Sequence, residues 1–600
     1  MTGTGIISLQ NDRICAIVMV GICIIERFEC CLKRKLEENM PQIVSIGNAD
    51  YESIRKENCF YVDKTSFIRN WWDKKDVATL IMRPRRFGKT LNMSMLNCFF
   101  SNKYAGRSEL FEGLEIWQEE KYQKLQGTYP VIFISFASVK ADNFDHARKQ
   151  MNAQICRIYE ENSFLLKGSL LSENEKQQFC SVRLDMDEAL GSMALNELCC
   201  YLYRFYKKKV IILLDEYDTP MQEAYLYGYW DEFVSYVRSL FNATFKTNLY
   251  MERALLTGIT RVSKESIFSD LNNLNVITTV SEEYQSDFGF TEQEVFRELD
   301  ARGMGEQKEL VKKWYDGFIF GTVKDIYNPW SITNFLDKRQ LRPYWAMTSS
   351  NRLVNQLLQQ ASGNVKRMLE DLMENRPIVV HFDEQIVFEQ LNRDENAIWS
   401  LLLASGYLKA EQVEYRGELL EPWYHLSITN LETRSMFSNM FRGWFDAGAE
   451  NYNAFVRALL EGSIKEMNIY MNEVALAVFS NFDTGKHVSE KAQPERFYHG
   501  FVLGLLVELR ERYVLKSNKE SGYGRYDVML VPRTTADDAI VIEFKVHDSK
   551  EEHTLEDTVA EALQQIEEKR YDAELIEAGI EEKRIRHYGF AFEGKKVLIG

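Results

Sequence analysis

This 600-residue sequence has few cysteines and prolines and no excess of positive charge. The ten cysteines lie between Cys15 and Cys200, and none forms a C-x-x-C pair, which argues against a disulfide framework or a zinc site. Ten prolines leave little room for a long disordered linker. A formal net charge of −16 argues against non-specific coating of nucleic acid, although an acidic body can still carry a local basic groove. We expect a cytoplasmic protein, because cysteines used in this way suit a reducing compartment.

Long apolar runs are also missing beyond the N-terminus. The segment Ile14–Ile25 is apolar, but it is too short to span a bilayer unaided and has no convincing cleavage site. We therefore expect residues 1–39 to be a non-structural extension, with Met40 as a candidate true start; a packed helix and a membrane anchor are the alternatives. The length of the chain predicts about three or four domains.

The first motif that carries chemistry begins with an apolar run, Ala78–Met82, typical of a buried parallel strand. The run continues into Arg83-Pro-Arg-Arg-Phe-Gly-Lys-Thr90 and then into a segment of helical spacing. This order is that of a Walker A loop, in which backbone N–H groups and a lysine hold phosphates and a hydroxyl binds Mg²⁺. Arg83 replaces the usual first glycine, so the turn must be made differently. The alternative interpretation of this motif is a basic surface turn that happens to contain Gly-Lys-Thr. The candidates for nucleotide binding are Arg86, Gly88, Lys89 and Thr90.

A second apolar run, Val210–Leu214, ends in Asp215 and Glu216, which is the Walker B arrangement. Asp215 is the candidate Mg²⁺ ligand together with Thr90, and Glu216 is the candidate that orients the attacking water. Asp218 is a further polar candidate. A third run, Arg253–Gly258, leads into Ile259-Thr260-Arg261. Thr257 and Arg261 are our candidates for sensing the terminal phosphate, with an exposed turn as the alternative.

Four motifs together resemble the AAA-ATPase-like family. They are Tyr61-Val-Asp-Lys-Thr65, the loop 83–90, Leu213-Leu-Asp-Glu-Tyr-Asp218, and Thr257-Gly-Ile-Thr-Arg261 with Lys264–Phe268. In that family the loop without its first glycine is usual, and a C-terminal nuclease-like domain commonly follows. The resemblance covers about residues 41–273 and implies that Asp63 and Lys64 lie beside the nucleotide.

The middle of the chain, residues 281–492, reads as mostly helical. Thr291 and Glu294 form a plausible capping box, and Tyr327-Asn-Pro-Trp330 also matches the family. Ile398–Leu403 followed by a strand at Tyr424–Ile428 would suit a winged-helix-like unit, with a plain helical lid as the alternative. No catalytic group of residues stands out there.

The C-terminal part resembles the PD-(D/E)XK nuclease fold. A helix candidate at Arg496–Leu506 precedes strands at Tyr513–Leu515, Arg525–Val531 and Ala539–Lys545. Asp527 and the Glu543-Phe-Lys545 pattern supply the acids and the lysine, although Tyr526 stands where the motif has proline. Two carboxylates can bind Mg²⁺ at a scissile phosphate, and the strand pleat puts Glu543 and Lys545 on one face. Secondary candidates are Glu520, Arg525, Gln565 and Lys569.

These features predict an α/β protein: a P-loop parallel-sheet ATPase domain (40–280), the helical middle region, and an α/β restriction-endonuclease-like domain (493–600). We expect ATP and Mg²⁺ as cofactors and nucleic acid, preferentially DNA, as the partner of the C-terminal domain. A homo-oligomer is compatible with this organisation, and membrane association is not expected. Bacterial defence or mobile-element biology follows from the family resemblance alone. The rival readings are a regulatory ATPase with a binding module in place of a nuclease, and a membrane-tethered signalling ATPase.

Overall fold

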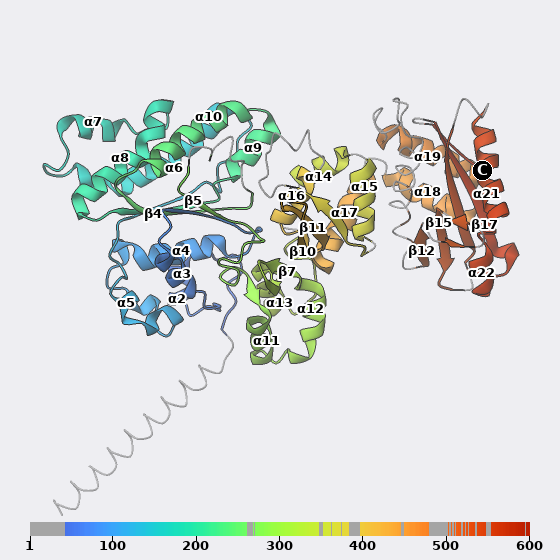
Figure 1. Ribbon diagram of the computed structural model, residues 1–600, viewed down its shortest axis with the longest axis horizontal. Coiled ribbons are helices and arrows are strands. Elements are labelled where there is room, and N and C mark those ends of the chain that lie inside the picture. Colours follow the sequence, from blue (N-terminus) through green and yellow to red (C-terminus); the bar gives the residue numbers. More distant parts are fainter. Residues whose placement is uncertain are drawn as a thin grey trace, which may run out of the picture.

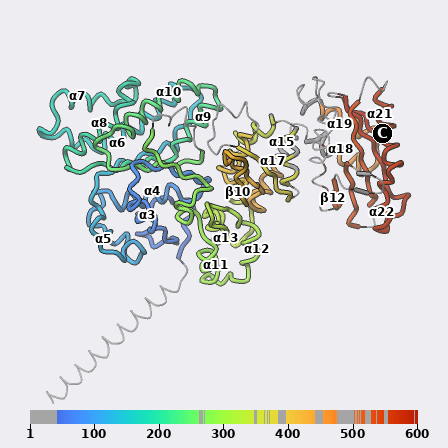
Figure 2. The backbone as a smooth tube through the Cα atoms, in the orientation of Figure 1, coloured from blue at the N-terminus to red at the C-terminus, as the bar shows by residue number. Residues whose placement is uncertain are grey.

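The computed structural model describes residues 42–600 except 261–267, 269–270, 347–351, 362, 374, 383–395, 446–448, 479–501, 503–505, 507–508, 510–511, 518–519, 522–523, 526, 535–536, 548–553 and 594–595. An N-terminal α/β region, a mixed middle region and a C-terminal α/β region follow one another (Figure 1), and the backbone passes through them in that order (Figure 2). Among the described residues, none of the helices combines the length and the apolar character needed to cross a membrane.

The N-terminal region is built on a parallel sheet of five strands in the order β2-β3-β4-β1-β5. Their bounds are β1 (Ala78–Met82), β2 (Val131–Ser135), β3 (Val210–Asp215), β4 (Met251–Gly258) and β5 (Leu274–Ile277). Because the strands are parallel, their carboxyl ends lie at one edge of the sheet, where ligands bind in such folds. Strand β4 lies between β1 and β3, so its end separates the two predicted nucleotide-binding motifs.

Helices cover both faces of this sheet (Figure 1). Alternate strand residues such as Leu80 and Ile212 pack with one set of helices, whereas Ile81 and Leu213 pack with the other. Burial of both faces explains why the strands are uninterrupted apolar runs. The first set contains α6 (Phe144–Glu161), α7 (Glu173–Ser181), α8 (Glu188–Tyr206), α9 (Thr219–Tyr227) and α10 (Trp230–Phe241); the second contains α2 (Tyr51–Lys56), α3 (Ser66–Lys74), α4 (Lys89–Phe100) and the short α5 (Glu120–Gln123).

The middle region contains helices and two small antiparallel sheets. The expected capping box of Thr291 and Glu294 is present at the start of α11. One sheet is β6 (Phe290–Thr291), β8 (Val323–Tyr327) and β7 (Phe318–Phe320), with α11 (Glu292–Ala301), α12 (Lys308–Tyr315) and α13 (Pro329–Lys338). The other is β9 (Ile378–His381), β11 (Glu421–Ile428) and β10 (Leu408–Arg416), with α14 (Arg352–Gln360), α15 (Gly363–Met373), α16 (Ala397–Ala404) and α17 (Leu431–Phe445). The hairpin of β10 and β11 beside α16 is compatible with the winged-helix-like alternative.

The C-terminal region is a mixed sheet in the order β12-β15-β16-β17-β18, in which only β16 and β17 pair in parallel. Its elements are β12 (Tyr513–Ser517), β15 (Val528–Pro532), β16 (Ala539–Val546), β17 (Ile585–Glu593), β18 (Lys596–Ile599), α21 (Leu555–Lys569) and α22 (Ala573–Glu577), with a separate hairpin of β13 (Glu520–Ser521) and β14 (Gly524–Arg525). Helices α21 and α22 lie on one side of the sheet (Figure 1).

The other side of this sheet is covered by helices that precede residue 493, where we expected the domain to begin. They are α18 (Ala449–Glu461) and α19 (Ile464–Val478), whose Phe455 and Met471 pack into the core of the C-terminal sheet. Asn468 also exchanges two hydrogen bonds of 2.8 Å with the main chain of Ile599 on β18. This pairing satisfies backbone groups of an edge strand that would otherwise be open. Helices α18 and α19 therefore pack with the C-terminal sheet although they precede residue 493.

Candidate functional site

The phosphate-binding loop has the expected strand–loop–helix geometry. Strand β1 is buried along its whole length and leads through the loop to α4, which begins at Lys89. Gly88 precedes the helix with a φ of 78°, in the left-handed region. A Cβ at Gly88 would meet no atom within 4 Å, so the backbone conformation rather than crowding calls for glycine there.

Lys89 is buried, and its ammonium is held by the loop itself. Its Nζ donates to the carbonyl oxygens of Arg83 and Pro84, each at 2.8 Å. Burial lowers the pKa of Lys89, while the nearby carboxylates, chief among them Glu216, oppose that shift. Both acceptors are uncharged carbonyls, so anionic phosphate oxygens would be stronger partners for the ammonium.

Arg83, which stands in place of the first loop glycine, is an anchor for the start of the loop. Its side chain is fully buried and donates to the carbonyls of Met82 (2.9 Å) and Thr278 (2.7 Å), and at 3.3 Å to those of Glu283 and Tyr284. The guanidinium carbon also lies 4.6 Å from the ring centre of Phe320. Burial lowers the pKa of Arg83 to about 9, which leaves it charged at neutral pH. The turn is thus fixed by a guanidinium that ties the loop to the 278–284 segment.

Asp215 links three parts of the predicted nucleotide site. It ends β3, and its two carboxylate oxygens accept from Thr90 Oγ1 (2.8 Å) and Thr257 Oγ1 (2.5 Å). Burial raises the pKa of Asp215, and the two hydroxyl donors oppose the shift. Thr90 and Asp215 offer the oxygen donors that Mg²⁺ takes beside nucleotide phosphates, so this pair fits the expected cofactor. Thr257, our candidate sensor, lies against the carboxylate.

The acidic residues after β3 have different partners. Glu216 has a φ of 50° and accepts from Thr219 Oγ1 at 3.0 Å. Asp218 is buried and accepts from the backbone N–H groups of Ile259 (2.9 Å) and Thr260 (2.8 Å). Asp218 therefore positions the turn that follows β4 and leads to Arg261, which itself lies outside the described residues.

Two residues of the middle region, Trp330 and Asn328, contact the phosphate-binding loop. The guanidinium carbon of Arg86 lies 4.3 Å from the ring centre of Trp330 on α13, so this nucleotide-binding candidate stacks on an indole. Asn328 caps α13 through its side-chain oxygen and donates its Nδ2 to the carbonyl of Arg85 at 3.3 Å. The sequence indicated a turn at Asn328, but nothing local in it pointed to this contact with the loop.

Asp63 and Lys64 make structural contacts. Asp63 accepts from the backbone N–H groups of Thr65 (2.9 Å) and Glu115 (2.8 Å). The Lys64 ammonium, which is buried, contacts both oxygens of Glu294 at 2.8 Å and the carbonyl of Ser286 at 2.9 Å. The ion pair of Lys64 with Glu294 joins the N-terminal region to α11 of the middle region.

The C-terminal carboxylate–lysine site is built on β16. Glu543 and Lys545 share the face of the strand toward α21, while Phe544 packs in the core on the opposite face. Asp527 lies just before β15, and its Oδ2 accepts from the Phe544 N–H at 2.9 Å. Two carboxylates close to a lysine form a donor set that fits Mg²⁺ and a phosphodiester. Of the secondary candidates, the side chains of Glu520 and Arg525 lie outside what the structure describes.

Helix α21 supplies partners for both groups on β16. Gln565 donates its Nε2 to Glu543 Oε1 and, at 3.1 Å, contacts the Tyr571 hydroxyl. Lys545 Nζ lies 3.3 Å from Glu561 Oε1. The secondary candidate Gln565 is thus brought to the site, and Tyr571, which follows the helix, is an addition for which the sequence gave no role.

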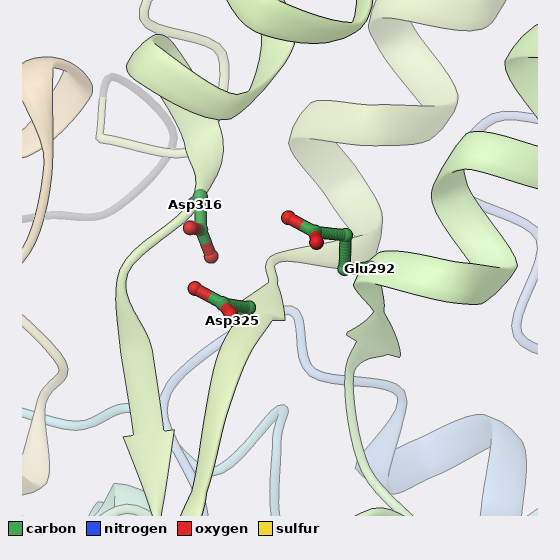
Figure 3. Close-up of side chains that lie close together, drawn as sticks. All are labelled: Glu292, Asp316 and Asp325. Carbon is green, nitrogen blue, oxygen red and sulfur yellow. The ribbon is translucent and has the colours of Figure 1, made fainter.

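A further acidic cluster, absent from our sequence analysis, lies in the middle region (Figure 3). Glu292, Asp316 and Asp325 offer ligand oxygens within 4.8 Å of one another. Lys312 contacts all three: it pairs with Glu292, and its Nζ lies 3.9 Å from Asp316 and 3.6 Å from Asp325. The lysine supplies the positive charge that a cation would bring, so the cluster is accounted for as an ion-pair network. Its carboxylates come from separate elements, which is why sequence spacing did not reveal it.

Comparisons with known proteins address the two ends of the chain. A family model described as predicted AAA-ATPase matches residues 45–268, and one for the PD-(D/E)XK nuclease superfamily matches residues 493–600. A protein of Azotobacter chroococcum mcd 1, described as an uncharacterized protein in the vnfD 5′ region, is 26% identical over 393 residues, which cover 65% of this chain and 68% of the relative. The solved Aeropyrum pernix ORC2 protein (ADPNP–ADP complexes) aligns with 67% of this chain and 96% of its own at 9% identity, with a TM-score of 0.22 that supports no argument. This chain therefore carries an AAA-ATPase-like domain at residues 45–268 and a PD-(D/E)XK nuclease superfamily domain at residues 493–600.

Proposed function

We propose that this protein hydrolyses ATP in its N-terminal domain and cuts nucleic acid, preferentially DNA, with its C-terminal domain in a Mg²⁺-dependent reaction. In the first site, Lys89 holds the outer phosphates and Thr90 and Asp215 hold the ion, while Glu216 orients the attacking water. Gly88 and Arg86 belong to the same loop, and Arg261 is the proposed sensor. A bacterial cytoplasmic setting in defence or mobile-element biology is the biological context that we favour.

The observation that carries the nuclease half is the placement of Glu543 and Lys545 on one face of β16, close to Asp527. The proposal assigns Asp527 and Glu543 to metal binding and Lys545 to the attacking water. A divalent ion bound there would stabilise charge on the scissile phosphate. Lys545 forms a partly exposed ion pair with Glu561, which costs little to break.

A second candidate function is a regulatory ATPase whose C-terminal domain binds without cutting. It is favoured by the hydrogen bond from Gln565 to Glu543, since that bond uses a carboxylate oxygen that the metal would need. In this case Gln565 of α21 would occupy Glu543 in place of a metal, and the C-terminal domain would serve as a binding module.

A cleavage assay distinguishes the two. Purified protein is incubated with linear and circular DNA, and with RNA, in Mg²⁺ or Mn²⁺, with and without ATP. The control is the Glu543→Ala/Lys545→Ala variant. Cutting that needs metal and is lost in the variant supports the nuclease, and its ATP dependence reports how the domains are coupled. ATP hydrolysis without any cutting would favour the binding module.

A further inference from the structure

The edge of the N-terminal sheet where the strands begin carries a group of exposed aromatic rings. Helix α8 ends there, and its last turn exposes Tyr203, Phe205 and Tyr206 by 37%, 48% and 38%. The rings of Phe205 and Tyr206 lie 4.8 Å apart, and Phe205 lies 5.1 Å from Phe164. The same helix buries Leu198 and Leu202 in the core, so these rings are additional to the packing face.

Three successive lysines follow these rings. Lys207 ends the helix in the left-handed region with a φ of 53°, and Lys207 and Lys209 are exposed. Lys208 Nζ lies 3.7 Å from the ring centre of Tyr129. Among the described residues, Lys207, Lys208 and Lys209 form no ion pair, although the chain as a whole carries a net charge of −16. We call residues 203–209 the aromatic–lysine surface.

This surface lies far from the nucleotide site. It directly precedes β3, which begins at Val210, whereas Asp215 marks the carboxyl end of that strand. At about 3.3 Å per residue, a strand of this length separates the two edges by roughly 17–20 Å. The rings and lysines therefore do not belong to the phosphate-binding loop, and a ligand bound by them would be a different one.

We propose that the aromatic–lysine surface binds single-stranded nucleic acid. A single strand combines flat bases, which stack on aromatic rings, with an anionic backbone that lysines attract. A duplex hides its bases in the stack and would use the lysines alone. A second copy of this chain docking through the same surface would bring two sets of lysines together, which disfavours a symmetric protein contact. The inference goes beyond the proposed function, which places nucleic acid at the C-terminal domain alone, and it requires no cleavage.

The hairpin of β10 and β11 provides a matched contrast. Its end exposes Tyr415 by 65% and Leu419 by 84%, more than any ring of the aromatic–lysine surface. The charged residues around it are mainly acidic, namely Glu414, Glu418 and Glu421, and the neighbouring Arg416 is paired with Glu414. Because carboxylates outnumber cations around these exposed apolar side chains, the hairpin should repel a polyanion, and it serves as the control site.

The test is fluorescence anisotropy with the full chain and labelled oligothymidylate or oligouridylate about 30 nucleotides long, long enough to span a stacking surface. EDTA replaces metal and ATP is omitted, so that neither cleavage nor hydrolysis contributes. We expect Phe205→Ser/Tyr206→Ser to weaken binding by about tenfold or more, because each ring offers a stacking face. Lys207→Gln/Lys209→Gln should weaken binding and reduce the slope of log affinity against log salt by about 1.4, or 0.7 for each lost contact. Tyr415→Ser/Leu419→Ser should bind as the wild type does.

Three results would overturn the inference. The first is that the wild type does not bind single strands at low salt. The second is that both surface variants keep the wild-type affinity, and the third is that the hairpin control loses as much affinity as the surface variants do. Light scattering on the same samples detects a second copy: a variant that changes the oligomeric mass but not the affinity would make the surface a contact between subunits. Circular dichroism and ATPase assays exclude misfolding. The Glu543→Ala/Lys545→Ala variant separates the two proposals, because it should lose cutting but keep binding that depends on Phe205 and Tyr206.

Discussion

The phosphate-binding loop and the C-terminal site both place a lysine close to carboxylates at a sheet, yet they hold it by different means. Lys89 is 5% exposed and donates to two carbonyls of its own loop, whereas Lys545 has a side chain that is 23% exposed and pairs with Glu561 from a helix. In the buried site the partners are neutral, so a phosphate anion can replace them. In the exposed site the partner is charged, but solvent weakens the pair.

The carboxylates differ in the same way. Asp215 accepts from the hydroxyls of Thr90 and Thr257, and Thr90 is itself a predicted magnesium ligand. These hydrogen bonds hold the two predicted magnesium ligands, Thr90 and Asp215, next to one another. Glu543 accepts from Gln565 of α21, which would have to yield or share the carboxylate if a metal were to bind there. The predicted nucleotide site is therefore ordered by its own hydrogen bonds, whereas the C-terminal site depends on the position of α21.

The largest expected effect comes from removing Lys89. Lys89→Ala should lower the rate of ATP hydrolysis by roughly 10²–10³-fold, because it deletes a buried donor to the charge that develops on the phosphates. Phosphate release measures the rate, and Lys103→Ala is the control, since Lys103 pairs with Glu161 at the surface. Wild-type turnover in Lys89→Ala would disprove the P-loop assignment.

Removal of Lys545 tests the other half of the comparison. Lys545→Ala should reduce metal-dependent cleavage by about 10²-fold, the low end of the contribution of general acid–base groups, and leave ATP hydrolysis unchanged. Glu561→Gln is the informative control: it frees Lys545 from its ion pair and should retain cutting. Loss of both activities in Lys545→Ala would point to misfolding or to a wrongly assigned site.

A smaller effect is expected where the sensor candidate contacts Asp215. Thr257→Val keeps the shape of the side chain but removes its hydrogen bond to a buried carboxylate, so kcat for ATP should fall by about tenfold. Thr257→Ser restores the hydroxyl and should recover most of the rate. Steady-state kinetics separate kcat from KM; equal rates for the Val and Ser variants would exclude a role for the hydroxyl.

The last effect is on stability rather than on a catalytic rate and concerns Glu432, a fully buried carboxyl on α17 that accepts from Ser331 Oγ at 2.8 Å and from the Trp345 N–H at 2.6 Å. Burial raises the pKa of Glu432 to about 7, above its ordinary value. The Glu432 carboxyl therefore binds its proton more tightly in the folded state than in the unfolded state. Its contribution to stability is complete below the ordinary pKa and is lost as the pH rises through about 7, by up to about 3 kcal/mol.

Glu432→Gln should remove this pH dependence. Hydrogen exchange of the α17 amides, corrected for intrinsic rates and compared at about pH 5 and pH 7.5, should show wild-type protection falling with pH and a flatter response in the variant. Glu411→Gln, on the partly exposed β10, is the control and should follow the wild type. A steep pH dependence that persists in Glu432→Gln would assign it to another group.

Local features of the structure could be read from the sequence. Strands β1 and β3 coincide with the apolar runs that predicted them, to within one residue, and α4 begins at the lysine of the motif. Buried parallel strands need uninterrupted apolar residues, and a phosphate-binding turn needs glycine before its helix, so these elements leave clear signals. Contacts between distant parts of the chain left no such signal in the sequence. Neither the role of Arg83 nor the packing of α18 and α19 on the C-terminal sheet has a local sequence pattern.

The sequence by itself determined which residue types stand at the ends of which strands, because hydrophobic period and loop motifs depend on neighbours along the chain. Only the tertiary structure decided that Thr257 meets Asp215, since β4 had to lie between β1 and β3. It likewise brought Gln565 to Glu543 and gathered the carboxylates around Lys312. Such contacts join residues that are distant along the chain, and strand order, register and helix packing fix them together.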